Sequence, residues 1–159
     1  MNELKVFAHN QFGEVRTLLK EGEPWFVAAD VDQLPAAGST PWHGYVYAIE
    51  YGDGIKIGHT TNLRARIKSI KRTAANYSDL RTGRVAFSKE HTNHKDVESQ
   101  LHSFCAALRV DKCERFNLSL DEFLASVPAI NFKDESAAKQ ERSAAFGDAL
   151  RSFATGGRK

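Results

Sequence analysis

Two short apolar runs separated by a tight turn constrain the fold more than any other feature of this sequence. Residues 45–50 (YVYAIE) are rich in aromatic and β-branched side chains, and residues 55–58 (IKIG) follow after Gly52-Asp53-Gly54. Aromatic and β-branched residues favour strands, and a short glycine-containing turn joins antiparallel neighbours. The two runs therefore predict a β-hairpin.

The segment after this hairpin predicts a basic, amphipathic helix. Its apolar side chains recur at helical spacing and leave the other faces to charged residues: Leu63, Ile67 and Ile70. Thr61 or Asn62 can cap the first turn, and the pattern continues to about Thr73. An apolar stripe of this period is typical of a helix that packs one face on a sheet.

Further patterns predict additional strands and helices along the chain. They indicate a strand at 84–88, a helix at 93–109, a strand at 114–118, a short helix ending before Pro128 and helical structure at 133–153. The helix at 93–109 rests on an apolar stripe formed by Val97, Leu101, Phe104 and Leu108. The expected fold class is α/β (α+β), with a small mixed, largely antiparallel sheet flanked by helices.

The residues before the hairpin predict a separate β segment. Strands at 4–8, 14–19 and 25–27 are joined by turns at 10–13 and 21–24, and residues 34–41 contain two prolines among small residues. We therefore divide the chain into a β segment (1–36), a linker (37–43), a central domain (44–128) and a C-terminal helix with a flexible tail (129–159).

Charge is distributed unevenly along the chain. Residues 1–54 contain eight acids and three bases, whereas residues 55–88 contain eight bases and one acid. A basic block of this kind is typical of a nucleic-acid-binding face, although a solvated helix with clustered charge has the same pattern.

The composition excludes several other classes of protein. No stretch approaches the roughly 18 apolar residues that a membrane span needs, and the first residues lack the order of a signal peptide. The two cysteines are too few for a disulfide scaffold. We therefore expect a cytoplasmic protein with no membrane partner.

Five short motifs follow one another between residues 44 and 127. They are Tyr45-Val46-Tyr47, Lys56-Ile57-Gly58, the run TTNLRAR at 60–66, Glu98 in the run VESQLH, and Glu114-Arg115-Phe116. In order and spacing they resemble the GIY-YIG nuclease superfamily, in the phage and fungal branch whose second motif reads KIG. Lys56 stands where other members have the second tyrosine.

This resemblance implies a divalent-metal-dependent endonuclease that hydrolyses DNA phosphodiester bonds. The residues that match the catalytic positions are Tyr47, Lys56, Arg66 and Glu98. Glu98 is then the ligand of Mg²⁺ or Mn²⁺, and Arg66 offers a planar fork to phosphate oxygens. Tyr47, with a lowered pKa, is expected to act as general base or to position the water, with Lys56 as its electrostatic activator, or the two roles are exchanged.

DNA is the expected partner of the basic face. We assign nucleic-acid binding to residues around the catalytic positions: Tyr45, His59, Arg64, Lys68, Lys71, Arg72 and His102. The arginines and lysines of this set are expected to hold the DNA backbone without reading bases.

The N-terminal run LKVFAHNQFGEVRTLLKEGEPWFVAADV, about residues 4–31, has a resemblance of its own. It is similar to the opening of the Bro N-terminal domain of phage antirepressors and implies a phage or prophage source, hence the host-cell cytoplasm. Its strand edges and apolar residues predict packing on the central domain or on another subunit. A homo-oligomer through this segment or through the C-terminal helix is therefore an expectation.

Three other interpretations fit parts of the sequence. The chain can be a DNA-binding regulator that does not cut, because Lys56 replaces a tyrosine, or a phage module that binds a host protein through Trp25, Phe26 and the C-terminal helix. A zinc site at His94, Glu98 and His102 is the third, but ligands spread over two helical turns diverge too far for easy tetrahedral closure.

Overall fold

Seven strands form one sheet in the order β1-β2-β3-β6-β4-β5-β7. The computed structural model describes residues 3–9, 13–20, 23–78, 80–110, 112, 114–135 and 137–155. Its strands are β1 (Glu3–His9), β2 (Gly13–Lys20), β3 (Glu23–Ala28), β4 (Tyr45–Tyr51), β5 (Gly54–Thr60), β6 (Thr82–Ser88) and β7 (Arg115–Phe116). All strand pairings within this described part are antiparallel, in agreement with the predicted α+β class.

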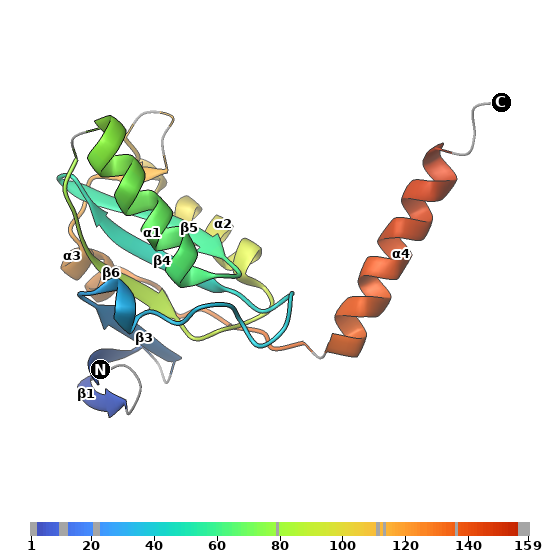
Figure 1. Cartoon of the computed structure of the whole chain (residues 1–159), viewed down its shortest axis with the longest axis horizontal. Helices are drawn as coiled ribbons and strands as arrows, with labels where there is room; N and C mark the ends of the chain where they lie inside the picture. The colour runs from blue at the N-terminus through green and yellow to red at the C-terminus, as the bar shows by residue number, and fades with distance from the viewer. Residues whose placement is uncertain are drawn as a thin grey trace.

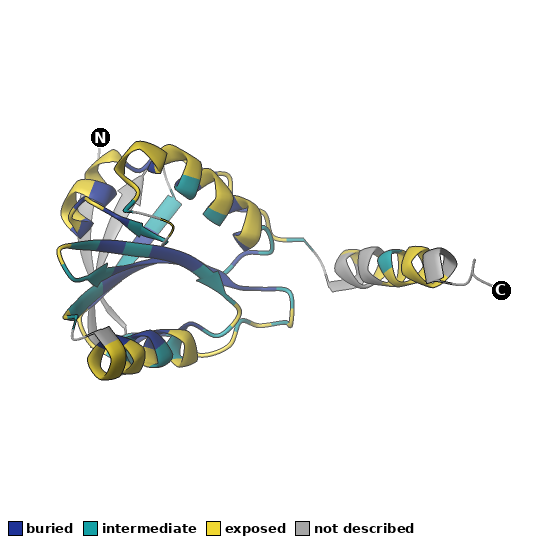
Figure 2. Ribbon diagram, turned by 90° about the horizontal axis from the view of Figure 1, so that it is seen from above, coloured by how far each residue is buried: buried dark blue, intermediate teal, exposed yellow. Residues whose placement is uncertain are grey.

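Helices cover both faces of the sheet (Figure 1). The helices of the described part are α1 (Leu63–Thr73), α2 (His94–Phe104), α3 (Leu120–Ser126) and α4 (Ala137–Thr155), with 3-10 turns at Val31–Gln33 and Ala106–Leu108 and a π-helical turn at Ala74–Ser78. Figure 2 shows the buried sheet between helices whose outer surfaces are exposed. Helix α4 stands apart from the sheet, and none of the described helices is long and apolar enough to cross a membrane.

The alternation of side chains along β4 creates two cores. Tyr45, Tyr47 and Ile49 point to one face, where they pack with the apolar stripe of α1. Val46 and Ala48 point to the other face, where they pack with residues of α2 and α3. Because side chains alternate along a strand, each polar residue of the hairpin is assigned to one of these two faces.

The predicted hairpin and basic helix are confirmed. β4 and β5 pair along their length through the Gly52-Asp53 turn, in which Gly52 has φ of 63°. Helix α1 begins after Asn62, whose side chain accepts the backbone N–H of Ala65 at 3.1 Å, and ends at Thr73.

The predicted stripe of the helix at 93–109 is wrong in its second half. Helix α2 ends at Phe104, and Phe104 and Leu108 are exposed. Cys105, four residues after Leu101 and on the same face as Val97, is buried where the prediction had Phe104 and Leu108. Burial raises the pKa of its thiol.

The N-terminal strands extend the central sheet. β3 pairs with β6, which places Trp25 opposite Ser88, and the buried indole contacts the rings of Phe123 and Phe132 edge-on at 5.7 and 6.3 Å. The predicted turns at 10–13 and 21–24 include residues outside the described part of the chain, as does the predicted flexible tail at 156–159.

Residues 34–43 lie against the start of α1. The carbonyl of Ala36 accepts the N–H of Leu63 at 3.2 Å, and the carbonyl of Pro35 accepts the N–H of Arg64 at 3.1 Å. The N–H of Gly38 donates to the carbonyl of Thr61 at 3.0 Å. These bonds fix this proline-rich segment beside the end of β5 and the start of α1.

Candidate active site

Tyr47 and Gly58 face each other across β4 and β5. A Cβ built on Gly58 would fall on the hydroxyl of Tyr47, so the phenol occupies the space that a side chain at 58 would need. The tyrosine ring is buried. The glycine of the Lys56-Ile57-Gly58 motif is therefore required by the packing of the Tyr47 ring.

Arg66, one turn into α1, reaches the same phenol. Its Nε donates to the hydroxyl oxygen of Tyr47 at 3.2 Å. Burial raises the pKa of Tyr47 above its ordinary value of 10.0, and the bond and charge of Arg66 offset this only in part. The pKa of Arg66 is raised by the same hydrogen bond. The expected lowering of the Tyr47 pKa is thus wrong, because desolvation outweighs the nearby cation.

Glu98 lies on the other face, on α2, between two imidazoles. His59 Nδ1 donates to its Oε2 at 2.5 Å, and His102 Nε2 lies 3.7 Å from its Oε1. His102 Nε2 also donates to the carbonyl of Ile57 at 3.1 Å. The Glu98 side chain is only 17 % exposed, so these contacts hold the carboxylate in one place.

Lys56 forms an ion pair with Glu114, which is not among the residues predicted for the site. Lys56 Nζ donates to Glu114 Oε2 at 3.2 Å. Burial raises the pKa of Glu114, but the hydrogen bond and charge of Lys56 outweigh it and keep the pKa below its ordinary value. The signal that points to Glu114 is its place before β7, whose Arg115 is the strand partner of Lys56.

These pairs form one electrostatic cluster. The carboxylates of Glu98 and Glu114 both act on the charge of Arg66 and on the phenol of Tyr47. His102 and Arg66 in turn act on Glu114. The predicted catalytic residues therefore form three contact groups: Tyr47 with Arg66, Lys56 with Glu114, and Glu98 with His59 and His102. These groups are linked by charge and not by direct contact.

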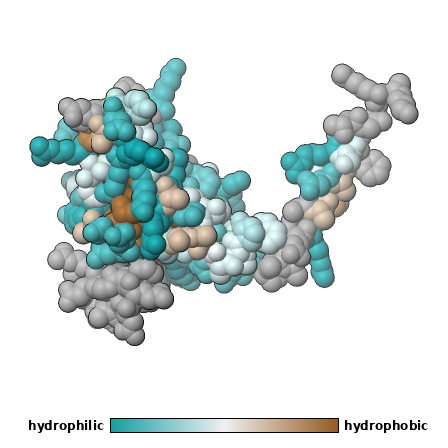
Figure 3. All heavy atoms as spheres, in the orientation of Figure 1, coloured by the Kyte–Doolittle hydropathy of each residue, from teal (hydrophilic) through white to brown (hydrophobic). Residues whose placement is uncertain are grey.

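The other predicted DNA-binding residues lie outside this cluster. Arg64 donates to the carbonyl of Leu34 at 2.7 and 3.0 Å, and Lys71 donates to that of Gly83 at 3.1 Å. Tyr45 is buried in the core against α1. Lys68 and Arg72 are exposed on α1, on the largely hydrophilic face seen in Figure 3.

The donor set fits a divalent cation that keeps most of its water. Among the described residues there is no group of three or more His, Cys, Asp or Glu side chains that could hold a metal, which disfavours a zinc site at His94, Glu98 and His102. Glu98 supplies one carboxylate in the cluster. Mg²⁺ is commonly bound by one or two carboxylates together with water and substrate phosphate, and Mn²⁺ accepts similar oxygen ligands.

The fold and these side chains suit one kind of ligand. A small antiparallel sheet, covered by helices on both faces, carries an arginine bonded to a phenol on one face and a largely buried carboxylate on the other. That set can bind a phosphodiester and a divalent cation.

Residues 44–131, more than half of the chain, match the T5orf172 domain, and the chain belongs to this family. The family is associated with phages and is related to a class of nucleases. No curated protein and no solved structure matches the chain.

Proposed function

We propose that this protein is a divalent-metal-dependent endonuclease of the GIY-YIG type that hydrolyses DNA phosphodiester bonds. The observation that carries the proposal is the Arg66–Tyr47 hydrogen bond together with the charge of Glu98, which acts on both of these groups from a separate element. A hydrolase for phosphodiesters needs groups that stabilise negative charge on phosphorus-bound oxygens and a site for a positioned water. The cluster offers both.

Arg66 is the phosphate-binding group of this mechanism. Its Nε is used by Tyr47, which leaves the two terminal nitrogens of the guanidinium for a non-bridging oxygen of the scissile phosphate. Because the phenol fixes the fork at one end, little side-chain entropy is lost when phosphate binds.

Tyr47 orients Arg66 beside the attacking water. The tyrosine side chain is 0 % exposed, and with a raised pKa the phenol stays protonated near neutral pH, so its oxygen accepts from the Arg66 guanidinium. In the reaction the water oxygen bonds to phosphorus and releases one proton to the solvent, the bond to the leaving oxygen breaks, and that oxygen takes up a proton from the solvent. Lys56 is paired with Glu114 and acts on this centre through that carboxylate, whose charge acts on Tyr47 and Arg66.

Glu98 is the residue that would hold Mg²⁺ or Mn²⁺. When bound, the cation supplies Lewis-acid stabilisation of the phosphate and lowers the pKa of a bound water. His59 and His102 orient the carboxylate, as partners of metal ligands commonly do.

A second function is favoured by one observation. Lys56 stands where the resembling nucleases have a tyrosine, and its ammonium is bound to Glu114. A protein with this site can bind DNA without cutting it and act as a regulator.

The test is the nicking of supercoiled plasmid in Mg²⁺, in Mn²⁺ and in EDTA. The proposal predicts nicking that needs a divalent ion and falls about a hundredfold in Tyr47→Phe, which loses the buried hydroxyl. Tyr77→Phe, at an 84 % exposed tyrosine, is the matched control and keeps full activity. Salt-sensitive DNA binding without any nicking by the wild type contradicts the nuclease and supports the regulator.

A further inference from the structure

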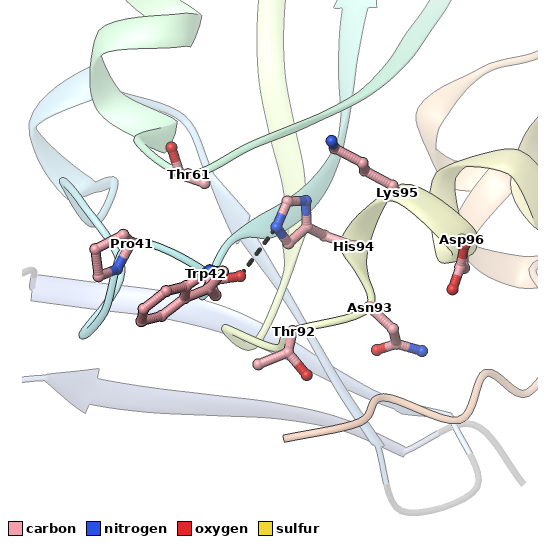
Figure 4. A pocket seen from close by; sticks show the side chains of 8 residues that line it. All are labelled: Pro41, Trp42, Thr61, Thr92, Asn93, His94, Lys95 and Asp96. Atoms are coloured by element: carbon pink, nitrogen blue, oxygen red, sulfur yellow. Dashed lines mark hydrogen bonds between the residues drawn. The ribbon is translucent and has the colours of Figure 1, made fainter. Parts of the chain in front are cut away.

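A hollow of about 360 Å³ opens beside the candidate active site, at the start of α2 (Figure 4). Its walls come from the loop before β4, the end of β5 and the first turn of α2. Trp42, Thr61, His94 and Lys95 are among the lining residues. None of the roles proposed above uses this hollow.

The hollow is joined to the site through two neighbouring imidazoles. The ring of His94 lies 5.2 Å from that of His59, which donates to Glu98. His94 and Glu98 also lie one turn apart on α2. A ligand in the hollow is therefore adjacent to the carboxylate that would hold the metal.

Trp42 forms a fixed aromatic wall. Its carbonyl accepts Nε2–H of His94 at 3.2 Å, and its backbone N–H donates to Oγ1 of Thr40 at 3.3 Å. The indole itself is partly exposed and lies beside Pro41 in Figure 4. With its backbone held by these two bonds, the indole offers a flat apolar face at low entropic cost.

Lys95 provides a cation on the other side of His94. Figure 4 shows its side chain directed toward the Thr61 side of the hollow, whereas Asp96 points the other way. Lys95 is exposed, and within the described part of the chain its ammonium forms no ion pair. It is thus available to a phosphate group.

We propose that this hollow binds one unpaired nucleotide of the DNA strand next to the scissile phosphate. The base stacks on Trp42, and its phosphate contacts Lys95. Aromatic side chains stack on any base, but a base inside a duplex is covered by its neighbours and reaches such a wall only when unpaired. The inference rests on the proposed function and names its substrate class: DNA with an unpaired nucleotide at the cut site.

Intrinsic fluorescence provides the test, because the two tryptophans differ. Trp25 is 1 % exposed, so a change on DNA addition reports Trp42. The full chain is titrated in EDTA with a continuous duplex, the same duplex with one bulged thymidine, and the same bulge without its base. The bulged base is expected to change the fluorescence and to bind about tenfold more tightly than the abasic bulge.

Variants separate stacking from folding. Trp42→Ala is expected to remove the tenfold preference while Trp42→Phe keeps part of it, and Phe146→Ala, at an exposed ring on α4, changes neither. Lys95→Ala is expected to weaken the two bulged DNAs about equally, to leave the continuous duplex nearly unchanged, and to lower the salt dependence of the bulged DNAs by about one phosphate contact.

Two outcomes contradict the inference and differ in what else they overturn. DNA binding with equal affinity for the bulged and abasic DNAs, and an unchanged fluorescence, overturns the nucleotide site and leaves the proposed function standing. No binding of any of the three DNAs overturns both.

Discussion

The two faces of the sheet carry different chemistry. On the α1 face, Arg66 and Tyr47 form a cationic, hydrogen-bonded pair. On the α2 face, Glu98 lies between His59 and His102. The first set suits a phosphate and the second suits a divalent cation.

Electrostatics links the two faces at this point of β5. Gly58 is the strand partner of Tyr47 on the α1 face, where the phenol fills the space that a side chain at 58 would need. The charge of Glu98 acts on Tyr47 and Arg66 from the α2 face. We predict that the two faces act together on a bound phosphodiester.

Removal of the Glu98 carboxylate is expected to lower the nicking rate most. Glu98→Gln keeps the size of the side chain and its contact with His59 but loses the charge that holds the cation. We expect nicking to fall about a thousandfold, with DNA affinity in EDTA unchanged. Asp148→Asn, at an exposed acid on α4, is the control and retains wild-type activity. Equal activity of the two variants would contradict the role of the α2 face.

Loss of the guanidinium is expected to have the next largest effect. Arg66→Ala should lower nicking by about two to three orders of magnitude, as the loss of one charge-stabilising donor set commonly does. Arg66→Lys should recover only part of this, because an ammonium cannot bond Tyr47 and phosphate as a planar fork. The rates are compared with Arg142→Ala, an exposed arginine of α4. Full rescue by lysine would show that charge alone suffices.

Acid is expected to destabilise the α2 side through His91. Burial lowers the pKa of this histidine from 6.5 to about 4. The unfolded chain therefore binds a proton that the folded chain does not, so stability is present above pH 6.5 and falls as the pH drops toward 4. The free energy of unfolding is expected to fall by about 3 kcal/mol over this range, and urea unfolding at several pH values measures the loss. In His91→Gln the acid-induced loss should be smaller by that amount, and an identical pH dependence would contradict it.

Addition of a side chain at Gly58 is expected to lower the free energy of unfolding by a smaller amount. Gly58→Ala places a methyl group on the Tyr47 hydroxyl, and overpacking of this kind costs about 1–3 kcal/mol. The phenol must move away from Arg66, so nicking should fall as well. Gly147→Ala is the matched control, because the nearest atom to its Cβ is 3.9 Å away on helix α4. Unchanged unfolding and nicking in Gly58→Ala would break the argument from packing.

Much of the fold follows from local patterns. The hairpin, the cap at Asn62 and the end of α1 near Thr73 were predictable because turn chemistry, capping and apolar period act within a few residues. The stripe through Phe104 and Leu108 failed because α2 ends at Phe104 and the next buried position is Cys105.

The candidate site residues could be named from the sequence, whereas their contacts could not. Tyr47, Arg66 and Glu98 followed from the motif resemblance, whereas the Lys56–Glu114 pair depends on the short strand β7, which comes from far along the chain. Arg64 illustrates the limit of charge counting. Its guanidinium is bound to the carbonyl of Leu34, a contact that no helical pattern contains.

The most direct test of the central claim, that the two faces act as one site, is a double-variant comparison of nicking rates in Mg²⁺. Arg66→Ala, Glu98→Gln and the combined variant are measured beside the wild type. Groups that act as a unit give non-additive losses, so the account predicts that the double variant is about as slow as the slower single variant. A double variant whose loss is the product of the two single losses would contradict the account, because the two faces would then act independently.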